Sequence, residues 1–111
     1  MAVSSISVTH YESGRLAYAS SKAALECGVK ILAKEALRYN TRVNAVRAAM
    51  TDTAMAEDYL SLTGKEESDV LSIQPLGMIE TSDIVKLMLY LLSDDSNKIT
   101  GSVFEINAGM I

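Results

Sequence analysis

Tryptophan is absent from this sequence, and cysteine and proline each occur only once in 111 residues. A single cysteine, Cys27, excludes an internal disulfide and a cysteine-based metal cluster. Its place in a helical pattern predicts a small buried thiol. The N-terminus has no basic region ahead of an apolar core, so we predict no secretory signal. Without disulfides or an export signal, the chain is expected in the reducing cytoplasm.

Excess positive charge and long apolar runs are also lacking. Ten Lys and Arg stand against fourteen Asp and Glu, which gives a net charge of −4. An acidic surface repels a phosphate backbone, so we predict no nucleic-acid partner. The longest apolar stretch, residues 87–92, is too short to span a bilayer, and we predict no membrane partner. The hydrophobic content of 49% is that of an ordinary soluble protein.

The sequence does hold a regular alternation of strand and helix patterns. Apolar, β-branched segments predict strands over residues 1–7, 42–47 and 101–106. Helical spacing of apolar residues predicts one helix over 18–39 and another that Thr81-Ser82-Asp83 can cap. The connection 48–74 predicts one or two short helices, and Pro75-Leu76-Gly77 predicts a turn. This alternation implies parallel strands joined by right-handed crossovers.

Three parallel strands make a small sheet with two open edges. Parallel sheets are normally covered by helices on both faces, and complete domains of this type usually have more strands. We therefore expect residues 1–111 to be a single partial domain of the α/β class.

A tyrosine and a lysine stand out at the start of the longer predicted helix. Tyr18 and Lys22 are four residues apart, which places both on one helical face. An ammonium beside a phenol stabilises the phenolate and lowers its pKa from about 10, so proton transfer near neutral pH becomes feasible. Ser5 ends the first predicted strand, where its hydroxyl could reach the same space. The alternative is a Tyr and a Lys on a solvated helix face.

Further motifs follow this group in register along the whole chain. They are Ser4-Ser5, Tyr18 to Lys22 with Ala23-Ala24-Leu25, Arg42-Val43-Asn44-Ala45-Val46, Thr53-Ala54-Met55, Pro75-Leu76-Gly77, Ser82-Asp83-Ile84, Leu91-Leu92-Ser93-Asp94, and Ile99-Thr100-Gly101 with Ala108-Gly109. Together they resemble the short-chain dehydrogenase/reductase family, and in particular its 3-oxoacyl carrier-protein reductase branch. The resemblance implies the C-terminal half of a Rossmann-type doubly wound parallel sheet, without the N-terminal dinucleotide-binding half.

The resemblance also implies a role for each candidate residue. Tyr18 would exchange a proton with the oxygen of a small carbonyl or alcohol substrate, and Ser5 would polarise that carbonyl. Lys22 would lower the pKa of Tyr18 and bind the nicotinamide ribose. Thr53, with the backbone near Thr51, would contact the nicotinamide carboxamide. The implied activity is an oxidoreductase that uses NAD or NADP, and the cofactor carries the hydride chemistry.

Several positions depart from the family pattern. No Gly-rich phosphate-binding fingerprint occurs, although that loop holds the pyrophosphate in such folds. Ala48-Ala49 replaces the family's Pro-Gly, Asn107-Ala108-Gly109 replaces Asp-Gly-Gly, and Met78 replaces a basic residue. We therefore expect the chain alone to bind a dinucleotide weakly and to be inactive. The alternative function is that of a truncated or divergent non-enzymatic chain, an assembly piece or a remnant.

The remaining expectations concern surfaces. The single histidine, His10, lies in the loop between Ser5 and Tyr18 without a ligand cluster, so we predict no metal site and favour a surface or loop role over a substrate contact. The acids of residues 66–69 are expected to form a solvated face. The helix over 18–39 is apolar around much of its circumference, which predicts a homodimer or homotetramer with this helix at a two-fold interface.

Overall fold

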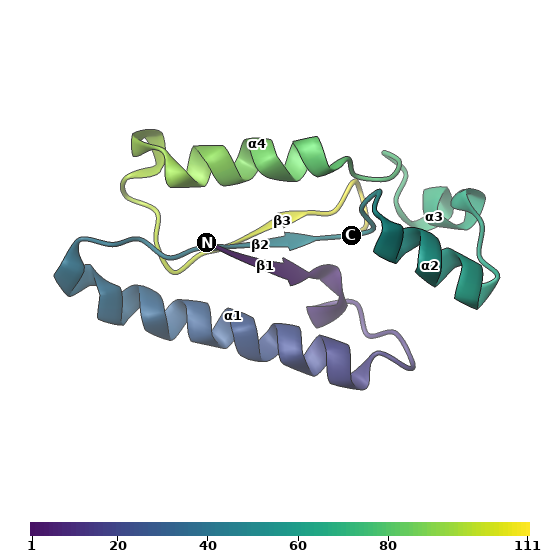
Figure 1. The fold of residues 1–111 in the computed structure, drawn as a ribbon, viewed down its shortest axis with the longest axis horizontal. Helices are drawn as coiled ribbons and strands as arrows, with labels where there is room; N and C mark the ends of the chain where they lie inside the picture. Colours follow the sequence, from purple (N-terminus) through teal and green to yellow (C-terminus); the bar gives the residue numbers. More distant parts are fainter.

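The computed structural model describes all 111 residues, and its centre is a sheet of three short parallel strands (Figure 1). β1 spans Ala2–Ser5, β2 spans Ala45–Ala48 and β3 spans Val103–Ile106, in the spatial order β1-β2-β3. Ala45 of β2 is in register with Ala2 of β1 and with Val103 of β3. The predicted α/β class and the parallel pairing are therefore confirmed.

Helices flank this sheet on two sides. Figure 1 shows α1 on one face of the sheet, α4 on the opposite face, and α2 and α3 beyond the ends at which the strands finish. Their bounds are Leu16–Ala36 for α1, Ala54–Thr63 for α2, Glu67–Ile73 for α3 and Thr81–Leu92 for α4, with single 3-10 turns η1 (Ile6–Val8), η2 (Leu37–Tyr39) and η3 (Asp94–Ser96). None of the helices has the length and apolar character needed to cross a membrane.

Three predictions about these elements need correction. The first strand stops at Ser5, because the Ser5 hydroxyl accepts the N–H of Ser7 and starts a 3-10 turn. The predicted cap Thr81-Ser82-Asp83 is wrong: Thr81 is already helical, and the N-cap residue is Glu80, which makes no side-chain cap bond. Cys27 is exposed rather than buried, because it lies on the side of α1 that faces away from the sheet.

The two faces of the sheet differ in chemistry. On one face, Val46 and Leu91 are fully buried between the sheet and α4. On the face beneath α1, Ser4, Arg47 and Glu105 stand side by side in register across the three strands. A polar row at the centre of a parallel sheet requires partners, because an unpaired buried charge is strongly unfavourable.

The partner of this polar row is Glu26, which is buried on α1. Its carboxylate accepts Ser4 Oγ at 2.6 Å and binds Arg47 through both oxygens, with Nε at 2.9 Å and the second guanidinium nitrogen at 2.6 Å. Arg47 also pairs with Glu105 at 2.9 Å. The Arg47 hydrogen bonds hold the pKa of Glu26 below its ordinary value of 4.5, although burial opposes this shift. These contacts attach α1 to all three strands.

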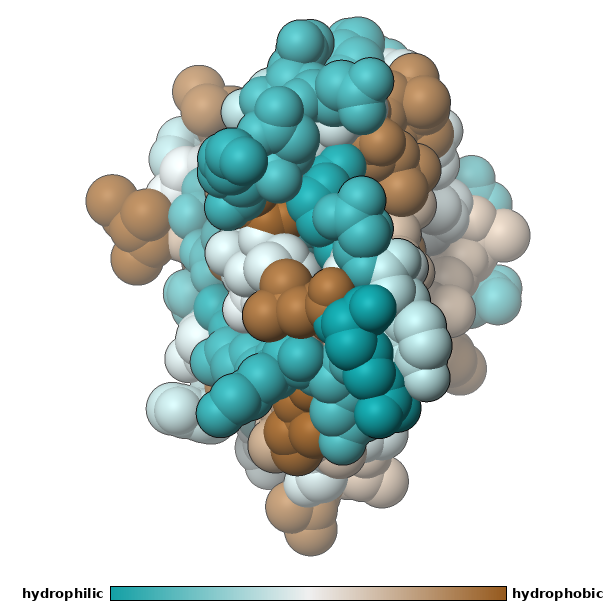
Figure 2. All heavy atoms as spheres, turned by 90° about the vertical axis from the view of Figure 1, so that its left-hand side faces the viewer, coloured by the Kyte–Doolittle hydropathy of each residue, from teal (hydrophilic) through white to brown (hydrophobic).

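The outer surfaces of α1 and α4 remain largely uncovered. Ile31 and Leu32 of α1 are 55% and 52% exposed, and Leu89 of α4 is 61% exposed. Figure 2 views the end of the molecule at which both helices finish, and hydrophobic side chains there are interspersed with hydrophilic ones. The buried core is correspondingly small, with 17 of 111 residues buried.

Candidate active site

A cleft of about 950 Å³ opens where the strands finish. Its walls come from the end of β1 and η1, the first turns of α1, the loop between β2 and α2, and parts of α2, α3 and α4. The five residues proposed from the sequence all line it: Ser5, Tyr18, Lys22, Thr51 and Thr53. The carboxyl ends of parallel strands are where α/β proteins generally bind their ligands.

Ser5 reaches the cleft because it is the last residue of β1 and the N-cap of η1. Its Oγ accepts the N–H of Ser7 and donates to Ser7 Oγ, both at 3.2 Å. The bond between the two hydroxyls is long for an O–H···O bond, so a carbonyl oxygen in the cleft could replace Ser7 Oγ as the acceptor at little cost in free energy.

Tyr18 and Lys22 face β1 from the first turns of α1. Lys22 Nζ donates to the backbone carbonyl of Val3 at 3.0 Å and lies 5.7 Å from the centre of the Tyr18 ring. Lys22 therefore ties the helix to the strand that carries Ser5. An ammonium has three donors, so two remain for a ligand.

The loop after β2 brings Thr51 and Thr53 to the opposite wall. Thr51 is half-buried, and its hydroxyl donates to the carbonyl of Ala49 at 3.0 Å. Thr53 is the N-cap of α2, where its side chain accepts the N–H of Ala56. Both hydroxyls thus serve the local backbone, and their free lone pairs and the neighbouring peptide groups are what the loop offers to a ligand.

The mouth of the cleft carries a charged cluster that sequence analysis missed. Glu12 Oε1 accepts the Tyr59 hydroxyl at 2.7 Å and Lys65 Nζ at 3.0 Å, while Glu12 Oε2 pairs with Arg15 Nε at 3.3 Å. The Arg15 guanidinium stacks 4.2 Å from the centre of the Tyr59 ring. The hydrogen bonds from Tyr59 and Lys65 hold the pKa of Glu12 below its ordinary value. The cluster joins the loop before α1 to α2.

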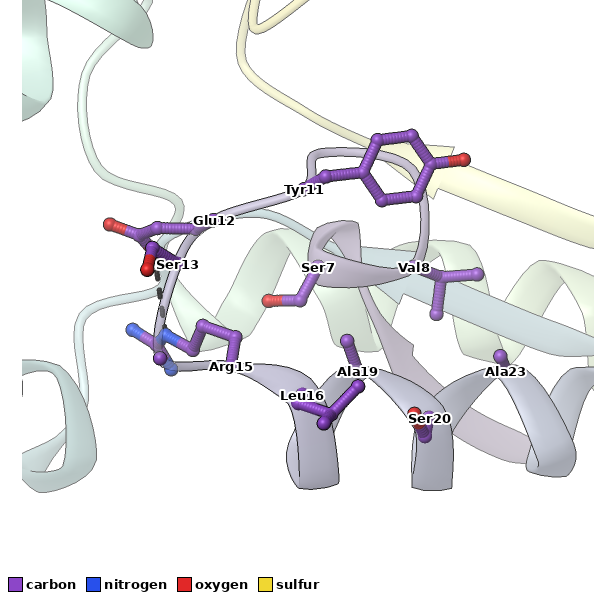
Figure 3. A pocket seen from close by; sticks show the side chains of 11 residues that line it. Ser7, Val8, Tyr11, Glu12, Ser13, Arg15, Leu16, Ala19, Ser20 and Ala23 are labelled. Atoms are coloured by element: carbon purple, nitrogen blue, oxygen red, sulfur yellow. Dashed lines mark ion pairs between the residues drawn. The ribbon is translucent and has the colours of Figure 1, made fainter.

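A smaller hollow of about 370 Å³ adjoins this cluster (Figure 3). It lies between the loop that holds Tyr11 and Glu12 and the first turns of α1, where Ala19 and Ala23 form a smooth wall. Figure 3 shows the ion pair between Glu12 and Arg15 at one end of the hollow.

His10 lies in the loop after η1, as predicted, but it is half-buried and lines the large cleft. Its Nδ1 is buried and has no hydrogen-bond partner. No group of three His, Cys, Asp or Glu side chains is arranged to hold a metal ion. The acids of residues 66–69 are exposed, although Asp69 also reaches the edge of the cleft.

The fold and cleft define a class of protein: one half of a Rossmann-type doubly wound α/β sheet with a cleft at its carboxyl edge. A family model described as enoyl-(acyl carrier protein) reductase matches residues 1–111. The chain belongs to this family, within the short-chain dehydrogenases/reductases.

Individual relatives agree with this assignment. The chain is 36% identical over 110 residues to the 3-oxoacyl-(acyl-carrier-protein) reductase of Thermotoga maritima, covering 98% of the chain and 44% of that protein. It is 36% identical over 93 residues to the L-xylulose reductase of Homo sapiens, covering 83% of the chain and 38% of that protein. The chain therefore spans less than half the length of these relatives.

Solved structures give the same result. A 4-hydroxyisoleucine dehydrogenase complexed with NADH superposes with a TM-score of 0.87 and 36% identity, covering 97% of the chain and 44% of the other protein. ElxO with NADP bound superposes with a TM-score of 0.84 and 28% identity, covering the same shares of the two chains. The prediction of a partial Rossmann-type sheet is thus confirmed.

Proposed function

We propose that this chain forms the substrate-binding and proton-transfer half of a nicotinamide-dependent oxidoreductase that interconverts a small carbonyl compound and its alcohol. The observation that supports this most is the meeting of Ser5, Tyr18 and Lys22 in one cleft, where β1 and the first turns of α1 face each other. By analogy with the Thermotoga maritima relative, a 3-oxoacyl thioester is the substrate class to test first.

Each of the three side chains has a distinct task in this proposal. Ser5 Oγ donates a hydrogen bond to the substrate carbonyl and holds it in the cleft. Tyr18 donates its proton to the same oxygen during reduction and accepts it during oxidation. The Lys22 ammonium stabilises the phenolate that this transfer leaves behind. A bound nicotinamide dinucleotide would supply the hydride.

The donors in the cleft suit the nicotinamide end of such a cofactor. Lys22 has donors available for ribose hydroxyls, and the peptide groups of the loop from Thr51 to Thr53 can face a carboxamide. The glycines are dispersed, and none of them forms a loop that could cradle a pyrophosphate. We therefore propose that residues 1–111 are a partial domain, that a dinucleotide-binding half completes it, and that this chain alone is inactive.

The DNA directly upstream of the Met1 codon tests the enzyme proposal. An in-frame Gly-rich segment supports it, and a stop codon favours the second candidate, a non-enzymatic assembly piece or remnant. In the polypeptide that such a segment completes, we expect Tyr18→Phe to abolish turnover while cofactor affinity stays nearly unchanged, because the lost proton is needed mainly in the transition state. Tyr39→Phe, at an exposed position, is the matched control. Near-normal turnover of Tyr18→Phe would show that Tyr18 is not the acid.

We further propose a homodimer or homotetramer with α1 at a two-fold interface. Leu25, Ile31 and Leu32 are exposed on this helix at 37%, 55% and 52%, and the exposed Gly28 beside them permits close approach of a second helix. A cytoplasmic location accords with the free, exposed thiol of Cys27. Light scattering tests the assembly, and a single species near 12.0 kDa would show that α1 is not an interface.

A further inference from the structure

Gln74 is the most completely buried polar residue of the chain, with 0% of its surface exposed. It follows α3 directly and is the C-cap residue of that helix. Its Oε1 accepts the N–H of Met50 at 3.0 Å, while its Nε2 donates to the carbonyls of Met50 at 2.9 Å and Gly77 at 2.7 Å. The side-chain amide therefore binds both polar groups of Met50 in the manner of a neighbouring strand.

Met50 begins the loop that carries Thr51 and Thr53 into the cleft. The loop is also held by Ile79, whose N–H donates to the carbonyl of Met50 at 3.1 Å and whose carbonyl accepts the N–H of Asp52 at 2.9 Å. Thr51 and Ile79 form an isolated parallel bridge. Gln74 and Ile79, which both lie between α3 and α4, thus hold the stretch from Met50 to Asp52 at two points.

The loop has little intrinsic stiffness of its own. Ala48 and Ala49, which precede it, impose no fixed φ as a proline would, and their side chains offer no hydrogen bonds. The conformation of the loop must therefore come from its partners. Gln74 is the only side chain that binds the Met50 backbone, and its burial removes competing water.

We propose that Gln74 is a positioning residue. Its hydrogen bonds to the Met50 backbone act as a clamp that fixes the conformation of the loop from Thr51 to Thr53, which forms one wall of the cleft. The inference rests on the proposed function, because the wall is the one assigned to the nicotinamide. Gln74 touches neither substrate nor cofactor in this assignment; it acts through the Met50 peptide. A leucine at position 74 would keep the side-chain volume but leave the N–H of Met50 without a hydrogen-bond partner. The loop from Thr51 to Thr53 would then shift, and small displacements of groups that position a cofactor strongly reduce the rate of reaction.

The first test is amide hydrogen exchange in the 111-residue chain, which requires no cofactor. In Gln74→Leu, we expect the N–H groups of Asp52 and Ile79 to exchange at least tenfold faster, although their own acceptors are backbone carbonyls that the substitution leaves in place. Ser96→Ala is the matched control, because Ser96 is 1% exposed and its hydroxyl donates to the carbonyls of Leu91 and Ser93 at the other end of α4. Unchanged protection at Asp52 and Ile79 would overturn the proposal.

The second test uses the completed, cofactor-binding enzyme. We expect Gln74→Leu to lower kcat/KM for the dinucleotide by about 10- to 100-fold, mainly through KM, and Ser96→Ala to leave it within about twofold. Gln74→Asn, which keeps a neutral amide but shortens the side chain by one methylene group, should fall between Gln74→Leu and the unsubstituted enzyme, and it serves if Gln74→Leu does not fold. Equal kinetics for all variants would overturn the positioning role. An unsubstituted enzyme that fails to bind any dinucleotide would overturn the proposed function, while hydrogen exchange would still decide whether Gln74 sets the loop.

Discussion

Replacing Glu26 by Gln should separate the contribution of the polar row from that of the apolar core. The substitution keeps the shape of the side chain but removes its charge. Glu26 accepts three hydrogen bonds, one from Ser4 and two from Arg47. A bond to a charged group contributes about 1.5–3 kcal/mol, against about 0.5–1.5 kcal/mol for a neutral one. The amide oxygen can still accept the bonds that Oε1 accepts, but the amide NH2 cannot accept the second bond from Arg47. The three bonds together therefore lose at least about 3 kcal/mol.

Part of this loss is offset, because burial disfavours the charged carboxylate of Glu26 and the neutral amide avoids that cost. We therefore expect the free energy of unfolding to fall by about 2 kcal/mol, which is a large fraction of the stability of a small domain. Urea unfolding followed by circular dichroism at pH 7 measures it, and with a typical slope of about 1–2 kcal/mol per molar urea the midpoint should fall by about 1–2 M. Glu35→Gln, at an exposed position of the same helix, is the control and should change stability by less than about 0.5 kcal/mol.

The effect of Glu26→Gln on the free energy of unfolding should also depend on pH, with a definite sign. The pKa of Glu26 is lower in the folded chain than its ordinary value of 4.5, chiefly because of the hydrogen bonds from Arg47. Its contribution is therefore complete above pH 4.5 and is lost as the pH falls through the folded pKa. The stability difference between the unsubstituted chain and Glu26→Gln should shrink on acidification. A difference that stays constant, or equals that of Glu35→Gln at neutral pH, would refute the assigned ion pair.

Three further outcomes are expected. Titration of the 111-residue chain with reduced cofactor, followed by fluorescence, should show no saturable micromolar site, because the phosphate-binding loop is lacking. Ala108→Gly should raise the free energy of unfolding by about 0.5–1 kcal/mol in thermal or urea unfolding, because Ala108 adopts a left-handed φ of 48° that glycine accepts without strain. Arg42→Met should lower it by about 2–4 kcal/mol, because the guanidinium binds the carbonyls of Leu91, Ser93 and Ile99.

The order of elements was predictable because it depends on local pattern. Alternating apolar segments and helical spacing gave the strand–helix–strand–helix–strand order and the parallel pairing. Element ends were less predictable because tertiary contacts set them. Ser5 ends β1 by capping a 3-10 turn, and α1 starts at Leu16 rather than at residue 18. The burial of Cys27 was also misjudged, because helical periodicity does not reveal which part of a helix the sheet covers.

The candidate site divides in the same way. Ser5, Tyr18 and Lys22 could be proposed because their spacing follows from one strand and one helix. The cluster of Glu12, Tyr59 and Lys65 could not, since it joins a loop to a helix and a following turn across 53 positions of sequence. The clamp of Gln74 on Met50 was equally hidden, because a glutamine before a proline gives no signal of burial. Both sets of contacts form only when the segment between β2 and α4 folds against the cleft, and this folding is not apparent from local sequence patterns.

The polar row beneath α1 links the stability of the chain to the geometry of its cleft. Tyr18, Lys22 and Glu26 are spaced four residues apart, so they form one stripe along α1 that faces β1. A helix held only by apolar contacts could rotate or slide by a fraction of a turn at modest cost. Such a shift of α1 is costly, because it separates the Glu26 carboxylate from Arg47 and leaves a buried charge unpaired. The ion pair therefore fixes the rotation of α1, and that rotation directs Tyr18 and Lys22 toward the end of β1, where Ser5 lies.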